Sequence, residues 1–185
     1  MVSRFLITTA DERSWRFDRP VLFLGEWCRL YDRRSIWEGL DTKVVPYHWD
    51  DRSKLYQDYL YLRDLHESLL ADLREALNQF HKVNYSKRYW RIVVGPWLGY
   101  FTQILFDRWT MIQRAINDFH VDGTIILDLP EESMVPTDQS DFIGLYVTDL
   151  WNHFIYSKIL SFCSNVPCQK VAVTEFRRKG LNSAN

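Results

Sequence analysis

The chain has 185 residues, of which 46% are hydrophobic and 25% charged, and its net charge at pH 7 is −1. This composition is typical of one globular domain or one large lobe, and the balanced charge argues against a nucleic-acid partner, which normally meets a clustered basic surface. The three cysteines show no C-x-x-C spacing, so we expect reduced thiols, no bound metal and a cytoplasmic location.

The N-terminal part predicts a small, mostly parallel sheet. The segment 4–9 is rich in β-branched and aromatic residues and predicts the first strand, and 21–24 is an unbroken apolar run that predicts a buried second strand. A short helix is expected over 29–40. The segment 43–47 then predicts a third strand, and Pro46 marks it as an edge strand or a strand end.

The middle of the chain predicts two long helices. Apolar residues recur at seven-residue intervals between Leu55 and Phe80, directly after two aspartates that are suitable N-caps. A second helical tract begins near Ser86, and a new helix is expected at Pro96, because proline is tolerated in the first turn of a helix. The two long helices can pack as an antiparallel helical hairpin within one lobe.

The C-terminal part adds a strand over 123–129, a third long helix over about 141–162 and a strand-like piece at 171–174. Together these elements predict an α/β fold with a Rossmann-like sheet. We expect residues 1–165 to form a single lobe and residues 166–185 to be a divergent or poorly ordered tail.

The longest nearly apolar stretch, 92–101, is half the length that crosses a bilayer, so no transmembrane segment is predicted, although peripheral membrane association is left open. Aromatic residues are abundant, at 16% of the chain. Rings with a polar handle favour surfaces that meet water or a polar ligand such as a sugar. A large aromatic core is the alternative explanation.

A first candidate site follows the second strand, where Glu26, Trp27 and Arg29 come directly after Gly25. Open α/β folds bind their ligands at the carboxyl ends of strands, so we interpret this cluster as part of a site. A Glu26–Arg29 pair that only fixes a turn is the alternative. Cys28 beside Arg29 could have a lowered pKa, but no particular histidine is placed to act as its base.

Two further clusters carry charged and aromatic side chains. The second lies between a strand and a helix start, where the helix dipole favours polar or anionic ligands, and its members are His48, Asp50, Asp51 and Arg52. At least one of these aspartates could serve only as the helix cap. The third contains Arg91, Trp97 and Arg108. Its arginines could clamp a carboxylate or phosphate, or pair with Asp107 or Glu26 inside the fold.

No complete catalytic signature is present: the chain lacks a phosphate loop, a dinucleotide glycine fingerprint, a nucleophile elbow and a metalloprotease helix. Four blocks, within 5–10, 20–28, 46–52 and 88–97, nevertheless resemble in sequence and order the N-terminal part of a bacterial family of transferases encoded in O-antigen and surface-polysaccharide loci. The resemblance implies the first lobe of a two-lobed glycosyltransferase similar to the GT-B architecture. It implies a nucleotide-sugar donor bound by a second lobe, and no cofactor in this one.

The resulting hypothesis is a cytoplasmic sugar-transferase lobe in which the three clusters line either the acceptor site or the cleft between the two lobes. Glu26 or Asp50 would act as the base or electrostatic partner at the anomeric carbon, while Arg91 or Arg108 holds an acidic sugar or a phosphate. Two alternatives stay open. One is a non-catalytic module that docks onto a separate partner enzyme through an aromatic surface, and the other is a small hydrolase that uses Glu26 or Asp50 with His48.

Overall fold

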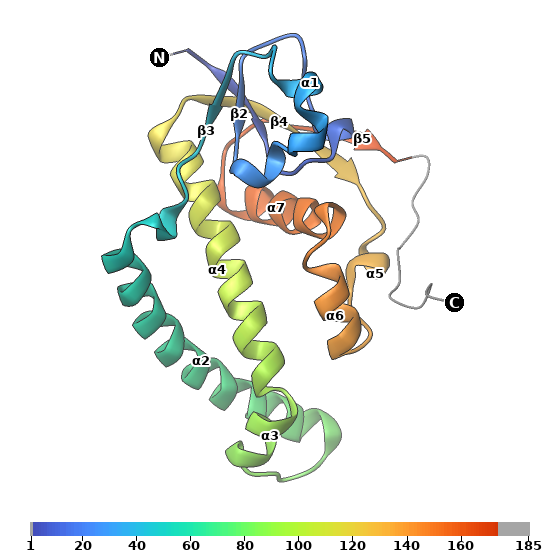
Figure 1. The fold of residues 1–185 in the computed structure, drawn as a ribbon. Helices are drawn as coiled ribbons and strands as arrows, with labels where there is room; N and C mark the ends of the chain where they lie inside the picture. The colour runs from blue at the N-terminus through green and yellow to red at the C-terminus, as the bar shows by residue number, and fades with distance from the viewer. Residues whose placement is uncertain (1, 174–185) are drawn as a thin grey trace. The chain divides into compact units, whose positions relative to one another are not determined.

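A computed structural model describes residues 2–173 of the chain (Figure 1). The chain divides into two compact units. Unit 1 is Met1–Tyr47 with Arg108–Asn185, and unit 2 is His48–Asp107. Helix α4, Gly95–Asp118, begins in unit 2 and ends in unit 1.

Unit 1 contains a five-stranded sheet in which every neighbouring pair is parallel, with the order β3-β2-β1-β4-β5. The α/β class and Rossmann-like sheet predicted from the sequence are therefore confirmed. The strands are β1 (Arg4–Ile7), β2 (Val21–Phe23), β3 (Thr42–Val44), β4 (Val121–Asp128) and β5 (Cys168–Ala172).

The central strands are buried because both faces of a parallel sheet are covered, which explains their unbroken apolar runs. All residues of β1 and β2 are buried. Arg4 is buried as well, and its guanidinium donates to the carbonyl of Val21 and to the carbonyl and carboxylate of Asp41, which ties β1 to the start of β3. As Pro46 indicated, β3 is an edge strand.

The helices of unit 1 are mostly short: α1 (Arg34–Trp37), α5 (Glu131–Met134), α6 (Gln139–Leu145) and α7 (Asp149–Cys163), with 3₁₀ turns at Glu12–Ser14, Glu26–Cys28 and Tyr31–Arg33. The predicted single helix over 141–162 is wrong, since α6 and α7 are separate. The break has a local cause, because the hydroxyl of Thr148 accepts a hydrogen bond from the backbone N–H of Trp151 and begins α7 as an N-cap. The last strand begins three residues before its predicted start.

Unit 2 is a helical hairpin made by α2 (Arg52–His81), α3 (Lys87–Val93) and the first half of α4, preceded by the 3₁₀ turn His48–Asp50. Asp51 caps α2 by accepting from the N–H groups of Ser53 and Lys54, as the sequence predicted. Ser86 caps α3 in the same way. At the tip of the hairpin, Leu70, Trp90 and Leu98 form a buried apolar cluster.

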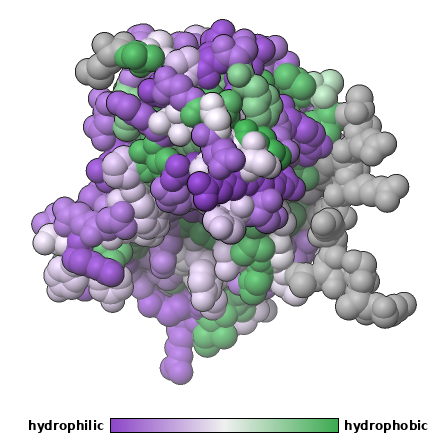
Figure 2. All heavy atoms as spheres, turned by 45° about the horizontal axis from the view of Figure 1, so that its top comes forward, coloured by the Kyte–Doolittle hydropathy of each residue, from purple (hydrophilic) through white to green (hydrophobic). Residues whose placement is uncertain are grey.

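The surface is mixed in character. On the face drawn in Figure 2, hydrophobic residues lie in small groups among hydrophilic ones. Across residues 2–173, no helix combines the length and apolar character that crossing a membrane requires.

Candidate functional site

The order of the strands points to the carboxyl end of β1 as the position of a site. The chain leaves β1 towards β2 on one side, whereas β4 and β5 extend the sheet on the other, so the topological switch lies between β1 and β4. Open α/β folds bind ligands in the crevice outside the carboxyl ends of strands at such a switch. The residues that follow β1, Thr8 to Ala10, are buried there.

Trp27 lies over this edge of the sheet in a fixed position. Its indole N–H donates to the carbonyl oxygen of Thr8 at 3.0 Å, and its ring meets the ring of Tyr47 edge to face at 6.4 Å. The ring also packs so closely over Gly25 that a Cβ atom there would lie 2.1 Å from it. Gly25 is therefore required by close approach, and the half-buried indole forms a rigid aromatic surface at the strand ends.

Glu26 and Arg29 flank this indole and bind each other. The Arg29 guanidinium donates to both carboxylate oxygens of Glu26, at 2.5 and 2.6 Å, and lies over the ring of Trp37 at 5.2 Å. The Glu26 side chain is 74% exposed. The predicted pairing is present, but at the surface, so the pair offers an accessible carboxylate and a cation held in place beside Trp27.

Cys28 does not have the environment of a nucleophile. Its side chain is fully buried, and the thiol donates to the carbonyl oxygen of Ile7 at 3.5 Å. Burial raises the pKa of Cys28 to about 12, because the thiolate would lose its hydration there. The lowered pKa considered from its neighbour Arg29 is therefore wrong, and the thiol is part of the packing.

Helix α7 contributes two residues to the same edge that sequence reasoning missed. His153 is buried, its Nε2 accepts from the backbone N–H of Leu127 at 3.0 Å, and its Nδ1 lies 3.2 Å from the hydroxyl of Thr8. Because Nε2 accepts, the neutral ring carries its proton on Nδ1 and donates to Thr8. Burial lowers the pKa of His153 to about 4, so the ring is neutral at pH 7 and joins α7 to β1 and β4.

Asp149 is the second of these residues and stands in the first turn of α7. Its carboxylate accepts from the backbone N–H of Ala10 at 3.2 Å, directly after β1. Partial burial raises the pKa of Asp149, and the nearby negative charge of Asp11 acts in the same direction. A carboxyl group with a raised pKa at the end of a strand is a candidate general base.

The carboxylate of Asp11 is paired locally with the guanidinium of Arg13. Burial would raise the pKa of Asp11, but hydrogen bonds from Arg13 and the charge of that guanidinium outweigh it, so the pKa is lowered. Arg33 binds Glu12 nearby at 2.8 Å and also lies close enough to stabilise the anionic form of Asp149. At this edge, Asp149 therefore has a raised pKa, whereas Asp11 and Glu12 are each paired with an arginine.

His48 of the second cluster belongs to a buried polar network inside unit 2. The imidazole of His48 is fully buried, with Nε2 2.9 Å from Asp107 and Nδ1 3.8 Å from Asp58. Asp58 also accepts from Trp49 at 2.9 Å and from Lys54 at 2.5 Å. His48 and Asp107 are the first and last residues of unit 2, so this buried network joins its two ends.

The other predicted residues have local partners or surface positions. Asp50, Asp51 and Arg52 are exposed at the start of α2. Arg91 binds a carboxylate with two donors at 2.7 Å each, but this carboxylate is that of Glu67 and not of Asp107 or Glu26, the two internal partners suggested from the sequence. Trp97 stacks on Phe101 at 5.1 Å. Arg108 donates to Asn152 at 2.9 Å in unit 1. That the three clusters share one cleft stays a prediction.

Residues 2–173 contain no group of three or more His, Cys, Asp or Glu side chains that could hold a metal ion. The sheet is all-parallel, and near its switch point lie the indole of Trp27, the carboxyl group of Asp149 and the guanidinium of Arg29, which is paired with Glu26. These features define an open α/β lobe of the Rossmann-like type. The chain belongs to a transferase family, because the family model described as LIC12162 family transferase matches residues 4–183. No curated protein and no solved structure matches it.

Proposed function

We propose that the chain is the acceptor-binding lobe of a glycosyltransferase that builds a bacterial surface polysaccharide such as O-antigen in the cytoplasm. Membership of a transferase family and the Rossmann-like sheet support the class. The observation that carries the sugar assignment is Trp27, a half-buried indole held by Thr8 and Gly25 at the end of the sheet. Such a surface can stack on the apolar face of a pyranose ring without losing conformational entropy.

The reaction that we propose for this edge is transfer of a glycosyl group to an acceptor hydroxyl. The hydroxyl oxygen loses its proton and bonds to the anomeric carbon, while the bond from that carbon to the nucleotide phosphate breaks. Asp149 suits the role of base, because its raised pKa lets it accept a proton more readily than an ordinary carboxylate. Glu26 suits the role of electrostatic partner, since Arg29 holds its exposed carboxylate in place beside Trp27.

The nucleotide-sugar donor would be held by a second lobe or a second chain in this proposal. Roles for Asp50, His48 and Arg91, which lie in unit 2, stay predictions that depend on that full assembly. The lobe alone should therefore bind an acceptor sugar, whereas a free nucleotide should bind it weakly.

The proposal is tested by saturation-transfer NMR of the chain with a panel of monosaccharides and with uridine diphosphate. We expect at least one sugar to receive saturation, and Trp27→Ala to abolish that signal. Tyr31→Ala removes a ring that is 81% exposed in the same unit and serves as the matched control. Sugar signals that survive in Trp27→Ala, or uridine diphosphate as the only ligand, would contradict an acceptor lobe.

The second candidate function is a non-catalytic docking module, and one observation favours it. Helix α2 and the start of α4 expose several aromatic side chains, namely Tyr56, Tyr59, Tyr61 and Tyr100, each more than half exposed. Tyrosine is enriched at interfaces because it combines an apolar ring with a polar tip. A chain that binds no sugar but forms a stoichiometric complex with the product of the adjacent reading frame, lost when these tyrosines are changed to serine, would support this function.

A further inference from the structure

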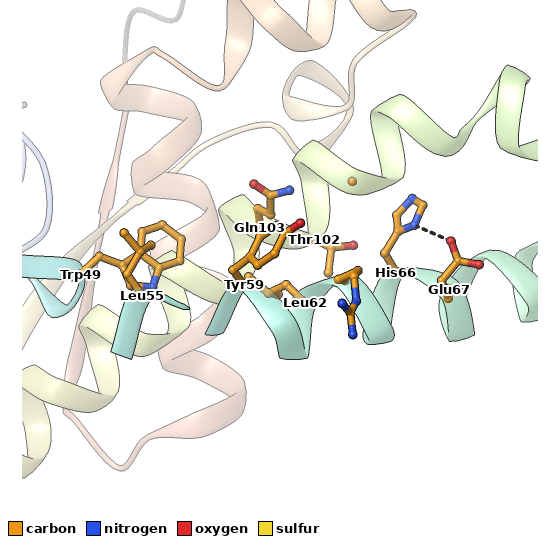
Figure 3. Close-up of a pocket in the computed structure, with 10 residues that line it drawn as sticks. Trp49, Leu55, Tyr59, Leu62, His66, Glu67, Thr102 and Gln103 are labelled. Atoms are coloured by element: carbon orange, nitrogen blue, oxygen red, sulfur yellow. Dashed lines mark ion pairs between the residues drawn. The ribbon is translucent and has the colours of Figure 1, made fainter. Parts of the chain in front are cut away.

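Unit 2 contains a groove of about 400 Å³ between α2 and the first half of α4. Figure 3 shows that its lining follows α2, with Trp49 and Leu55 at one end, Tyr59 in the middle, and His66 and Glu67 at the other end. From Leu55 to His66 the helix advances roughly 16 Å, at about 1.5 Å per residue. The groove is therefore long and narrow, and it lies within one unit.

The groove presents mainly apolar surface. Two of its polar groups are satisfied by the fold, because Thr102 donates to the carbonyl of Leu98 at 2.7 Å and His66 Nε2 lies 3.1 Å from the carbonyl of Gly95. Gly99 leaves part of its wall open: a Cβ there would meet only the His66 ring, at 3.7 Å, which is an ordinary contact. A ligand in this groove thus meets mainly apolar surface, with Arg63 and Gln103 among the polar residues of the lining.

Charge is uneven along the groove. Near Trp49, Lys54 is paired with Asp58, and on the middle stretch Arg63 is paired with Asp64. At the far end, the single carboxylate of Glu67 binds two cations, Arg91 at 2.7 Å and Lys87 at 3.0 Å. Among these ion pairs, the Glu67 end therefore has an excess of one positive charge.

We propose that this groove binds an amphiphile that consists of one extended hydrocarbon chain and an anionic head. The chain lies along α2 from Trp49 towards His66, where apolar surface is buried on both sides. The head lies beside Arg91 and Lys87, where the surplus cation attracts it. This site is independent of the proposed sugar site, since every lining residue belongs to unit 2.

Calorimetric titration of the whole chain with dodecyl phosphate, kept below its micelle concentration, tests the site. Dodecyltrimethylammonium has the same chain with the opposite charge, and inorganic phosphate has the head alone. We expect dodecyl phosphate to bind about tenfold more tightly than dodecyltrimethylammonium, which corresponds to one favourable charge contact, and inorganic phosphate to bind far more weakly. Equal affinity for the two amphiphiles would overturn the proposal.

Two substitutions locate the ligand. Gly99→Leu fills the groove with a side chain while it raises helix propensity, so we expect binding to be lost and the melting temperature not to fall. Gly99→Ala, whose methyl group fits without a clash, should weaken binding less. Unchanged affinity in Gly99→Leu would place the ligand elsewhere and overturn the proposal.

The head-group assignment has its own control. Changing both Lys87 and Arg91 to Gln leaves Glu67 without its two cations, so the preference between the two amphiphiles should reverse in the double variant. A preference that stays anionic would exclude this end of the groove. Failure here would leave the sugar site untouched, because Trp27 and Asp149 lie in unit 1.

Discussion

The ring of His153 accepts a hydrogen bond from the backbone N–H of Leu127 and lies 3.2 Å from the hydroxyl of Thr8. One neutral imidazole thus links α7 with β4 and with the end of β1, beside the proposed acceptor site. A protonated ring could not accept from Leu127, and the N–H of that residue would lose its partner in a buried position.

Acidification should therefore destabilise the fold through His153. Its pKa is about 4 in the folded chain and about 6.5 in an unfolded one, so the unfolded state binds the proton first as pH falls. The contribution of the neutral His153 ring to the free energy of unfolding is fully present above pH 6.5. It is lost as pH falls towards 4, and the total loss is ~3 kcal/mol. Urea unfolding of the chain and of His153→Gln at several pH values measures this. The stability difference between them should shrink on acidification, and a difference independent of pH would contradict the assignment.

Replacement of Gly25 by alanine should displace Trp27. The added Cβ would lie 2.1 to 2.4 Å from three atoms of the indole ring, so the ring must move away from Thr8, at a cost of about 1–3 kcal/mol for such overpacking. Near-ultraviolet circular dichroism and urea unfolding follow the two effects. Gly39→Ala is the matched control, because no atom lies within 4 Å of its added Cβ. Equal behaviour of both variants would show that Trp27 does not pack on Gly25.

The sequence predicts the framework of this lobe better than its site, for a physical reason. Strand burial, the Asp51 cap and the start of a helix near Pro96 depend on neighbours a few residues away, so local patterns indicate them. The contact of His153 with Thr8 spans 145 residues and depends on the order of the strands. The cap at Thr148 was missed because it interrupts an otherwise apolar stretch that is typical of one continuous helix.

The same distinction applies to the candidate residues. Glu26, Trp27 and Arg29 follow a strand directly, and their position at its carboxyl end could be predicted. For Arg91, the sequence suggested a ligand carboxylate or phosphate, or an internal pair with Asp107 or Glu26, and did not identify Glu67, which lies 24 residues earlier on another helix. Sequence patterns thus predict the chemical type of a contact, whereas the packing of distant elements selects the partner.

Glu67 should titrate well below an ordinary glutamate. Hydrogen bonds from Arg91, and then from Lys87, lower its pKa to about 2, because both cations favour the ionised form. In carbon-detected NMR titrations, Arg91→Gln should raise this pKa towards its usual value, and Lys87→Gln should raise it less. The stability that these pairs add is present above pH 4.5 and declines as pH falls towards 2. A pKa that does not respond to Arg91→Gln would show that the ion pair does not form in solution.

Asp107 should be the most sensitive carboxylate of unit 2. It is almost fully buried and binds His48, whose other ring nitrogen faces Asp58. Asp107→Ala removes one partner and leaves a buried polar ring behind, which should cost about 2–4 kcal/mol of unfolding free energy. Asp107→Asn keeps an acceptor for the ring and should cost less. Asp64→Ala, which breaks an exposed pair with Arg63, should change stability by no more than ~0.5 kcal/mol. If Asp107→Ala were as mild as Asp64→Ala, the buried network would not hold the ends of the hairpin together.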